Sequence, residues 1–145
     1  EKTEFNVLNI NNINEAKSGK INLLEIQDGI DQVEFGKATP AAGKAAYVSL
    51  EKALNDLKNG LIDALVTAPI NKDNIQSENF KFPGHTEYLA EKDGKEALMF
   101  MISEKVKIAV VTGHIPVGEI AKKINQESIV KKLHLINQSL QNKIY

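Results

Sequence analysis

The chain has 145 residues, enough to bury one hydrophobic core but not two complete ones, so we expect residues 1–145 to form a single unit. Its 18 basic and 19 acidic residues nearly cancel, which excludes binding to nucleic acid or to an anionic membrane through net charge. The sequence has no cysteine, which excludes disulfides and thiolate metal clusters and favours a cytoplasmic location.

The first thirty-five residues carry the weakest signals. Two short apolar runs, Val7–Ile10 and Ile21–Ile26, are separated by an Asn-rich stretch that contains Gly19. Short apolar runs bounded by turn residues are typical of strands. We therefore predict two strands joined by a loop in this region.

A capped helix is the clearest element. Thr39 can cap a helix and Pro40 suits the first helical position, and apolar residues then recur at helical spacing. The sequence predicts a helix from Pro40 to about Lys58. The run that follows, Asp63–Pro69, is apolar and ends in proline, so it is predicted to be a strand buried on both faces.

The last third of the chain predicts a hairpin and two helices. The β-prone runs Ala97–Ile102 and Val106–Val111 are close enough in sequence to pair antiparallel. Helices are predicted over Val117–Lys123 and after Asn125. The second helix should bury an apolar stripe, which consists of Ile129, Leu133, Ile136 and Leu140.

Together these elements predict an α/β fold with a mixed sheet and flanking helices, and the fold is expected to be incomplete at both ends.

Polar residues follow apolar runs at three places, where α/β folds often hold their ligands. Most informative is the Pro83–Gly84 turn, which precedes His85 and Thr86. Thr86 is predicted to cap a helix there, and the free N–H groups of a helix start can hold a phosphate. Lys72 can reach a phosphate or carboxylate as a flexible charge. The alternatives are a capped helix whose histidine only packs, and a surface lysine.

The third place holds His114, which follows an apolar run and leads to Pro116. An imidazole at a strand end can ligate a divalent metal or act as a general base. One histidine forms neither site alone, and a structural histidine is the alternative. His134 is interpreted as a solvated surface residue. The Gly-rich fingerprints of nucleotide-binding loops are absent.

Four segments, taken in order, resemble consecutive motifs of the 4-hydroxythreonine-4-phosphate dehydrogenase family. They are Gly36–Ala46, Asp63–Lys72, Phe82–Ala90 and Val106–Pro116. The strings Thr-Ala-Pro-x-x-Lys at 67–72 and Gly-His-Thr-Glu at 84–87 are rare, and the order and spacing of all four make the combination specific. The match covers residues 36–116.

The resemblance implies an isopropylmalate-dehydrogenase-like α/β fold and a homodimer with a shared active site. The implied reaction, in pyridoxine 5'-phosphate biosynthesis, is NAD-dependent oxidation of 4-phosphohydroxythreonine to 2-amino-3-oxo-4-phosphobutanoate, with decarboxylation to 3-amino-2-oxopropyl phosphate. His85 and Thr86 would contact the substrate. His114 would be the first of three histidine ligands of a divalent metal, with zinc, magnesium or cobalt as candidates.

The departures from the family are also informative. We find no counterpart of its Gly-rich N-terminal segment or of the later motifs that carry the other two metal histidines, and Gly113 stands where we expect threonine. We therefore interpret the chain as the central part of a larger dehydrogenase, inactive alone. Two alternatives remain: a non-catalytic phosphate-binding or dimerisation module that uses residues 97–111 for self-association, and a metal-dependent hydrolase in which His85 and His114 share an ion.

Overall fold

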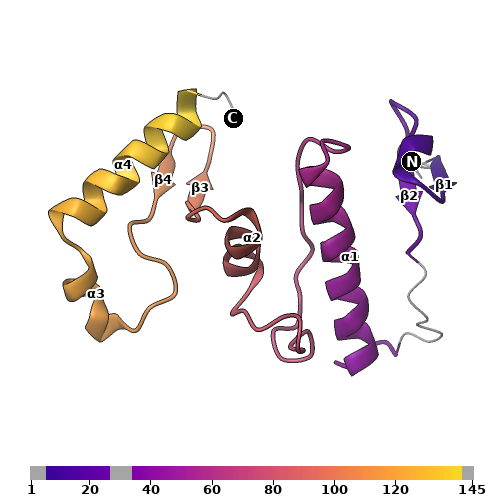
Figure 1. Cartoon of the computed structure of the whole chain (residues 1–145), viewed down its shortest axis with the longest axis horizontal. Coiled ribbons are helices and arrows are strands. Elements are labelled where there is room, and N and C mark those ends of the chain that lie inside the picture. The colour runs from indigo at the N-terminus through magenta and orange to yellow at the C-terminus, as the bar shows by residue number, and fades with distance from the viewer. Residues whose placement is uncertain (1–5, 27–33, 142–145) are drawn as a thin grey trace. The chain divides into compact units, whose positions relative to one another are not determined.

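The computed structural model of the chain describes residues 6–26 and 34–141. The chain divides into two compact units, unit 1 (Glu1–Lys92) and unit 2 (Asp93–Tyr145), and each is described by itself. The expectation that residues 1–145 form a single unit stays a prediction. The elements are β1 (Val7–Ile10), a 3-10 turn (Ile13–Glu15), β2 (Ile21–Leu24), α1 (Pro40–Lys58), α2 (His85–Asp93), β3 (Phe100–Ile102), β4 (Lys107–Ala109), α3 (Val117–Lys123) and α4 (Gln126–Gln141) (Figure 1).

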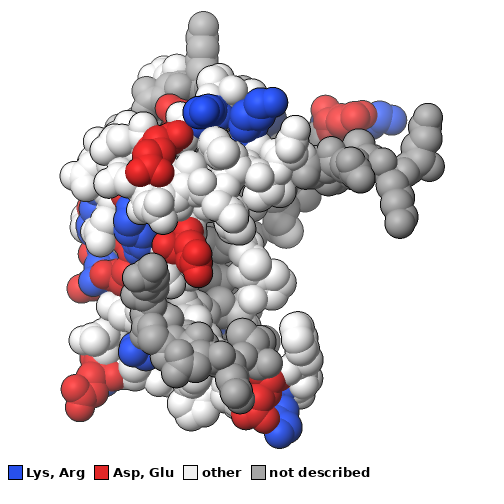
Figure 2. All heavy atoms as spheres, turned by 90° about the vertical axis from the view of Figure 1, so that its right-hand side faces the viewer, with Lys and Arg blue, Asp and Glu red and all other residues white. Residues whose placement is uncertain are grey.

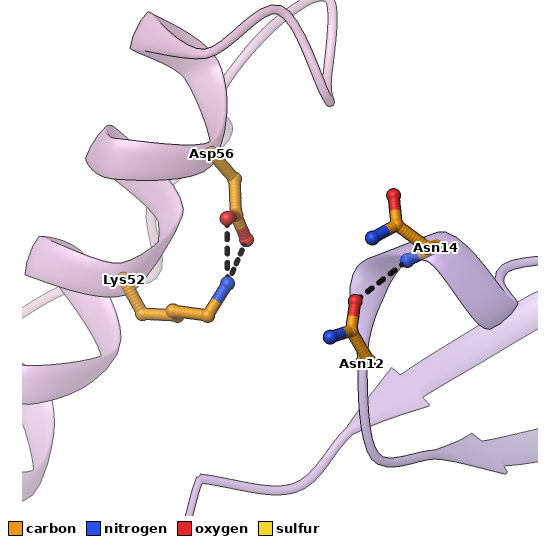
Figure 3. A network of polar contacts seen from close by, with 4 residues as sticks. All are labelled: Asn12, Asn14, Lys52 and Asp56. Carbon is orange, nitrogen blue, oxygen red and sulfur yellow. Dashed lines mark hydrogen bonds and ion pairs between the residues drawn. The ribbon is translucent and has the colours of Figure 1, made fainter.

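The strands β1 and β2 confirm the prediction of two strands and a loop. They pair in parallel, with Val7 opposite Ile21 and Ile10 opposite Leu24. Parallel neighbours require a crossover connection that returns the chain to the end at which the first strand began. Part of that connection is the 3-10 turn, where the Asn12 side chain accepts a hydrogen bond from the Asn14 N–H at 3.0 Å (Figure 3).

Helix α1 begins and ends where the sequence predicts. The Thr39 Oγ1 accepts a hydrogen bond from the Ala42 N–H at 3.2 Å, which satisfies one of the free donors of the first turn. Pro40 occupies the first turn, where its missing N–H costs nothing. After Lys58 the chain turns through Gly60, whose φ of 68° lies in the left-handed region that glycine adopts without strain.

Unit 1 has a core built from α1, α2 and the loop between them. Leu50 and Leu54 of α1 pack with Ile75 and Phe80 of the loop and with Tyr88 of α2. The rings of Phe80 and Tyr88 lie with their centroids 4.8 Å apart, and both residues are fully buried. Burial of large aromatic side chains contributes strongly to stability, so this cluster fixes the start of α2 against α1.

Residues 61–84 contain no helix or strand, and the predicted strand Asp63–Pro69 is wrong. In Figure 1 the chain runs back along α1 through this segment without a paired neighbour. An apolar run becomes a strand only where another strand satisfies its backbone groups, and no described strand pairs with it. Val66, at its centre, is 95% exposed.

Unit 2 contains the predicted hairpin and both predicted helices. Strands β3 and β4 pair antiparallel, with Met101 opposite Ile108, although each strand is shorter than its apolar run. The described residues thus form two separate two-stranded sheets, one parallel and one antiparallel, rather than one mixed sheet. The α/β composition is confirmed.

The face that α4 buries differs from the predicted stripe. Leu133 is 58% exposed, and Ile129 and Leu140 are exposed as well. The orientation of the helix agrees with two contacts of Lys132, which donates to the Ala97 carbonyl at 3.0 Å and forms an ion pair with Glu96 at 2.7 Å. These contacts turn Lys132 inward and leave the apolar stripe largely outside. The half-buried residues are instead Ser128, Lys132, Leu135, Ile136 and Ser139.

Charges of both signs lie close together on the face shown in Figure 2. One pair on α1 is partly buried: the Lys52 Nζ lies 2.5 Å from both carboxylate oxygens of Asp56, which is only 6% exposed (Figure 3). A buried carboxylate without such a partner would be strongly destabilising.

Within the part of the chain that the structure describes, no helix has the length and apolar character to cross a membrane.

Candidate functional site

The turn before α2 holds the two residues with the strongest sequence signal. Helix α2 begins at His85, and the Gly84 carbonyl accepts a hydrogen bond from the Tyr88 N–H at 3.3 Å. Thr86 therefore lies inside the first turn, and its predicted role as the cap is wrong. The helix starts two residues earlier than a Thr86 cap would place it, because Gly84, which is buried, supplies the turn itself. The first N–H groups of a helix have no partner within it, so His85 and Thr86 stand where donors are available to an anion.

Lys72 lies next to this turn. A Cβ placed on Gly84 would be 3.8 Å from the Lys72 Cε and 3.6 Å from the Glu87 Oε2. The predicted contact residue Lys72 and the predicted pair His85 and Thr86 are thus brought together, although twelve residues separate them in sequence. A lysine beside a helix start adds a full positive charge to the partial charge of the helix dipole. Lys72 and the helix start can attract an anionic group, and the Glu87 carboxylate at the same turn offsets part of their positive charge.

The loop that carries Lys72 packs closely on α1. The Asn71 side chain accepts hydrogen bonds from the Asp73 and Asn74 N–H groups, both at 3.0 Å, and so closes a turn around Lys72. The Asn74 side chain donates to the Thr39 carbonyl at 3.0 Å. Any side chain at Gly43 of α1 would collide with this loop, because a Cβ there would lie 1.9 Å from the Asn74 carbonyl oxygen. The glycine permits the close approach of helix and loop.

Gln76 also holds this loop, and no pattern in the sequence points to it. Its Nε2 donates to the Lys72 carbonyl at 2.9 Å and to the Phe82 carbonyl at 3.0 Å. One carboxamide therefore bridges the Lys72 loop and the segment that enters the Pro83–Gly84 turn. A single glutamine in a polar loop has no characteristic spacing, so only the geometry identifies it.

A cavity of about 250 Å³ opens beside His85. One wall is α1, through residues that include Ala46 and Ser49, and the other is the extended segment 65–70. The cavity is more apolar than polar, and His85 and Thr67 are polar residues on its wall. Residues of the Thr-Ala-Pro-x-x-Lys and Gly-His-Thr-Glu strings thus share one cavity, as expected for parts of one site.

His114 lies in unit 2, in the exposed connection between β4 and α3. Next to it the Ile115 N–H donates to the Gly113 carbonyl at 3.0 Å and tightens the turn. His85 belongs to unit 1 and His114 to unit 2, so the alternative in which they share an ion stays a hypothesis. His134 is exposed on α4, in agreement with its interpretation as a surface residue. Across residues 6–26 and 34–141, no three His, Cys, Asp or Glu side chains group in a way that suits a metal ion.

Comparison with known proteins extends the resemblance beyond the four motifs. The family described as "Pyridoxal phosphate biosynthetic protein PdxA" matches residues 1–145. A 4-hydroxythreonine-4-phosphate dehydrogenase from Bacteroides thetaiotaomicron is 45% identical over 133 residues, covering 90% of this chain and 36% of the relative. One from Sulfurihydrogenibium sp. is 39% identical over 141 residues, covering 97% of this chain and 43% of the relative.

The fold comparison agrees. A crystal structure of 4-hydroxythreonine-4-phosphate dehydrogenase from Klebsiella pneumoniae matches 97% of this chain with a TM-score of 0.82 and 26% sequence identity. The match covers 44% of that chain. This chain therefore spans less than half the length of the proteins it matches.

Proposed function

Because the chain belongs to the pyridoxal phosphate biosynthetic protein PdxA family, we propose that the protein containing it is a 4-hydroxythreonine-4-phosphate dehydrogenase. The proposed reaction is oxidation of the secondary alcohol of 4-phosphohydroxythreonine by NAD, in which a hydride passes to the cofactor and a proton is released. The product, 2-amino-3-oxo-4-phosphobutanoate, then loses carbon dioxide to give 3-amino-2-oxopropyl phosphate for pyridoxine 5'-phosphate synthesis. The activity is proposed for the whole protein, of which residues 1–145 are one part.

The position of Lys72 beside the start of α2 supports this proposal most strongly. His85 and Thr86 present side-chain and backbone donors there, and the Lys72 side chain reaches the same turn. A phosphorylated substrate needs donors and positive charge in one place, because the phosphate group carries up to two negative charges. In the proposed function these three residues bind the substrate and orient it for hydride transfer to the nicotinamide.

A divalent metal would supply Lewis-acid chemistry at a substrate oxygen, and zinc, magnesium and cobalt remain candidates. In the proposed function His114 is one imidazole ligand. The described residues do not include a ligand group that holds a metal by itself, so the remaining ligands belong to other parts of the whole protein. In this proposal the residues that bind NAD also belong to other parts of the whole protein, because this sequence has no Gly-rich dinucleotide fingerprint.

The proposal also includes an isopropylmalate-dehydrogenase-like fold, a homodimer whose subunits share the active site, and a cytoplasmic location. Support for the dimer comes from unit 2, where Met101 and Ile108 face each other across the hairpin and are each 52% exposed. Apolar side chains exposed side by side favour contact with another protein surface. The proposed partners are a small phosphorylated substrate and a second subunit, with no nucleic acid or membrane.

The direct test measures NADH formation from 4-phosphohydroxythreonine by the whole protein, with zinc, magnesium or cobalt added in turn. We expect turnover, and unphosphorylated 4-hydroxythreonine should be a much poorer substrate. Failure to form NADH with all three metals would contradict the proposal. Phosphate binding without any NADH formation would favour the non-catalytic module instead.

A pair of histidine variants locates the site. We expect His85→Asn to lower kcat/KM by roughly a hundredfold, since the imidazole would no longer contact the substrate. The control is His134→Asn, which changes an exposed histidine of unit 2 and should leave kcat/KM unchanged. Equal effects of both substitutions would contradict the assignment of His85.

A further inference from the structure

From the bridge that its carboxamide forms, we infer that Gln76 is the positioning residue for Lys72. The two donors of the Gln76 side chain bind the carbonyls of Lys72 and Phe82, at 2.9 and 3.0 Å. The first carbonyl belongs to the residue that carries the charge, and the second lies two residues before Gly84. Gln76 thereby fixes the backbone of Lys72 relative to the turn that carries His85 and Thr86. This inference rests on the proposed function of that turn.

The surrounding hydrogen bonds leave the backbone of Lys72 little freedom. On one side, Asn71 closes a turn over Asp73 and Asn74, and its carbonyl accepts from the Ile75 N–H at 3.3 Å. On the other side stands the bridge from Gln76. The hydrogen bonds of Asn71 act within the short loop, whereas the bridge connects the Lys72 carbonyl with the segment that leads into α2. Loss of the bridge would leave the direction of the lysine side chain less defined.

The contribution of Gln76 to position is separable from any contribution to folding. Gln76 is exposed, and a hydrogen bond in contact with water adds only modestly to stability. Lysine, however, is a flexible side chain that loses conformational entropy when its ammonium binds a ligand. A backbone that already directs Lys72 toward Gly84 reduces that loss. Removing the bridge should therefore weaken substrate binding more than it weakens the fold.

The experiment compares Gln76→Met and Gln76→Glu with wild type in the whole protein. Methionine keeps the length without donors, and glutamate keeps the shape but places a carboxylate against two carbonyls. We expect the KM for 4-phosphohydroxythreonine to rise roughly tenfold for Gln76→Met and further for Gln76→Glu, with kcat within about twofold and the KM for NAD unchanged. Gln138→Met, on the exposed side of α4, is the matched control and should leave both KM values unchanged.

A double-mutant cycle with Lys72→Met tests whether Gln76 acts through the lysine. If it does, Gln76→Met has no further effect on KM once Lys72 is replaced. Additive effects, or an unchanged KM in the single variant while wild type turns over, would overturn the inference. If wild type itself shows no turnover, the proposed function fails, and calorimetric titration with inorganic phosphate then tests Gln76 alone: equal affinities for wild type and Gln76→Met would overturn it.

Discussion

The two units bury apolar side chains to very different extents. All five members of the core cluster, Leu50, Leu54, Ile75, Phe80 and Tyr88, belong to unit 1. Among the described residues of unit 2 none is buried, and large apolar side chains on its hairpin and on α4 are about half exposed. Removal of apolar surface from water is the main source of stability. The residues proposed to bind substrate therefore lie in the unit that has a buried core of its own.

This difference has a consequence for the site. Lys72, His85 and Thr86 lie on segments that flank core residues Ile75, Phe80 and Tyr88, so packing fixes their backbone. His114 lies in an exposed connection of a unit that has little packing of its own. A preformed site needs rigid support, and the core of unit 1 provides it for the residues proposed to bind the phosphate group of the substrate.

The largest expected effect tests whether unit 1 depends on its core. Phe80→Ala should lower the free energy of unfolding by about 3–5 kcal/mol, because it empties the centre of the aromatic cluster. Ile108→Ala, on the exposed side of β4, should cost well under about 1 kcal/mol. Urea unfolding followed by circular dichroism measures both. Similar losses for the two variants would refute the contrast between the units.

Smaller changes in the free energy of unfolding are expected from a glycine-to-alanine substitution in each unit. Gly43→Ala places a methyl group against the Asn74 backbone and should cost about 1–3 kcal/mol. Gly118→Ala in α3 meets no atom within 4 Å and should be neutral or stabilise by up to about 1 kcal/mol, since alanine favours helix. Thermal unfolding of the two variants measures the difference. A tolerated Gly43→Ala would show that the Lys72 loop is not tightly packed on α1.

The smallest effect concerns the ion pairs of unit 2. Hydrogen bonds from Lys131 and then Lys132 hold the pKa of the Glu96 carboxyl below its ordinary value of 4.5. A lowered pKa stabilises the fold above the ordinary value, and this stabilisation is lost as the pH falls through the lowered pKa. The protection factors of the α4 amides, which correct for the intrinsic pH dependence of exchange, should therefore fall as the solution is acidified below pH 4.5.

The control for this pH dependence is Glu96→Gln. The variant cannot ionise at that position, so its α4 amides should exchange faster than those of wild type at neutral pH and at the same rate in acid. Lys131 is 65% exposed and Glu96 is 37% exposed, so solvent screens these ion pairs and keeps the difference small. Identical exchange in both proteins at neutral pH would show that the ion pairs do not hold the helix.

Local signals in the sequence predicted the helices well. Thr39 and Pro40 mark the start of α1, and Pro116 precedes α3, so both helices lie where the sequence places them. Two features that depend on partners elsewhere in the chain were not predicted correctly. The run Asp63–Pro69 is β-prone but unpaired, and the apolar stripe of α4 is turned outward by contacts of Lys132 with residues 96 and 97.

In the candidate site, too, local sequence signals were predictive and contacts between distant residues were not. The strings at 67–72 and 84–87 predicted Lys72, His85 and Thr86 as candidates, and the structure places Lys72 beside the Gly84 turn that His85 and Thr86 follow. The part played by Gln76 depends on a bridge between two carbonyls, which no spacing rule describes. The start of α2 was misplaced by two residues because a buried glycine, not a threonine side chain, forms the turn.

The central claim is that unit 1 alone forms the anion-binding end of the site. Titration of the isotope-labelled 145-residue chain with inorganic phosphate, followed by the amide resonances, tests it most directly. We expect saturable shifts at Gly84, His85 and Thr86, reduced in Lys72→Met, and no shifts around His114. Absence of shifts at residues 84–86, or equal shifts throughout both units, would contradict the account.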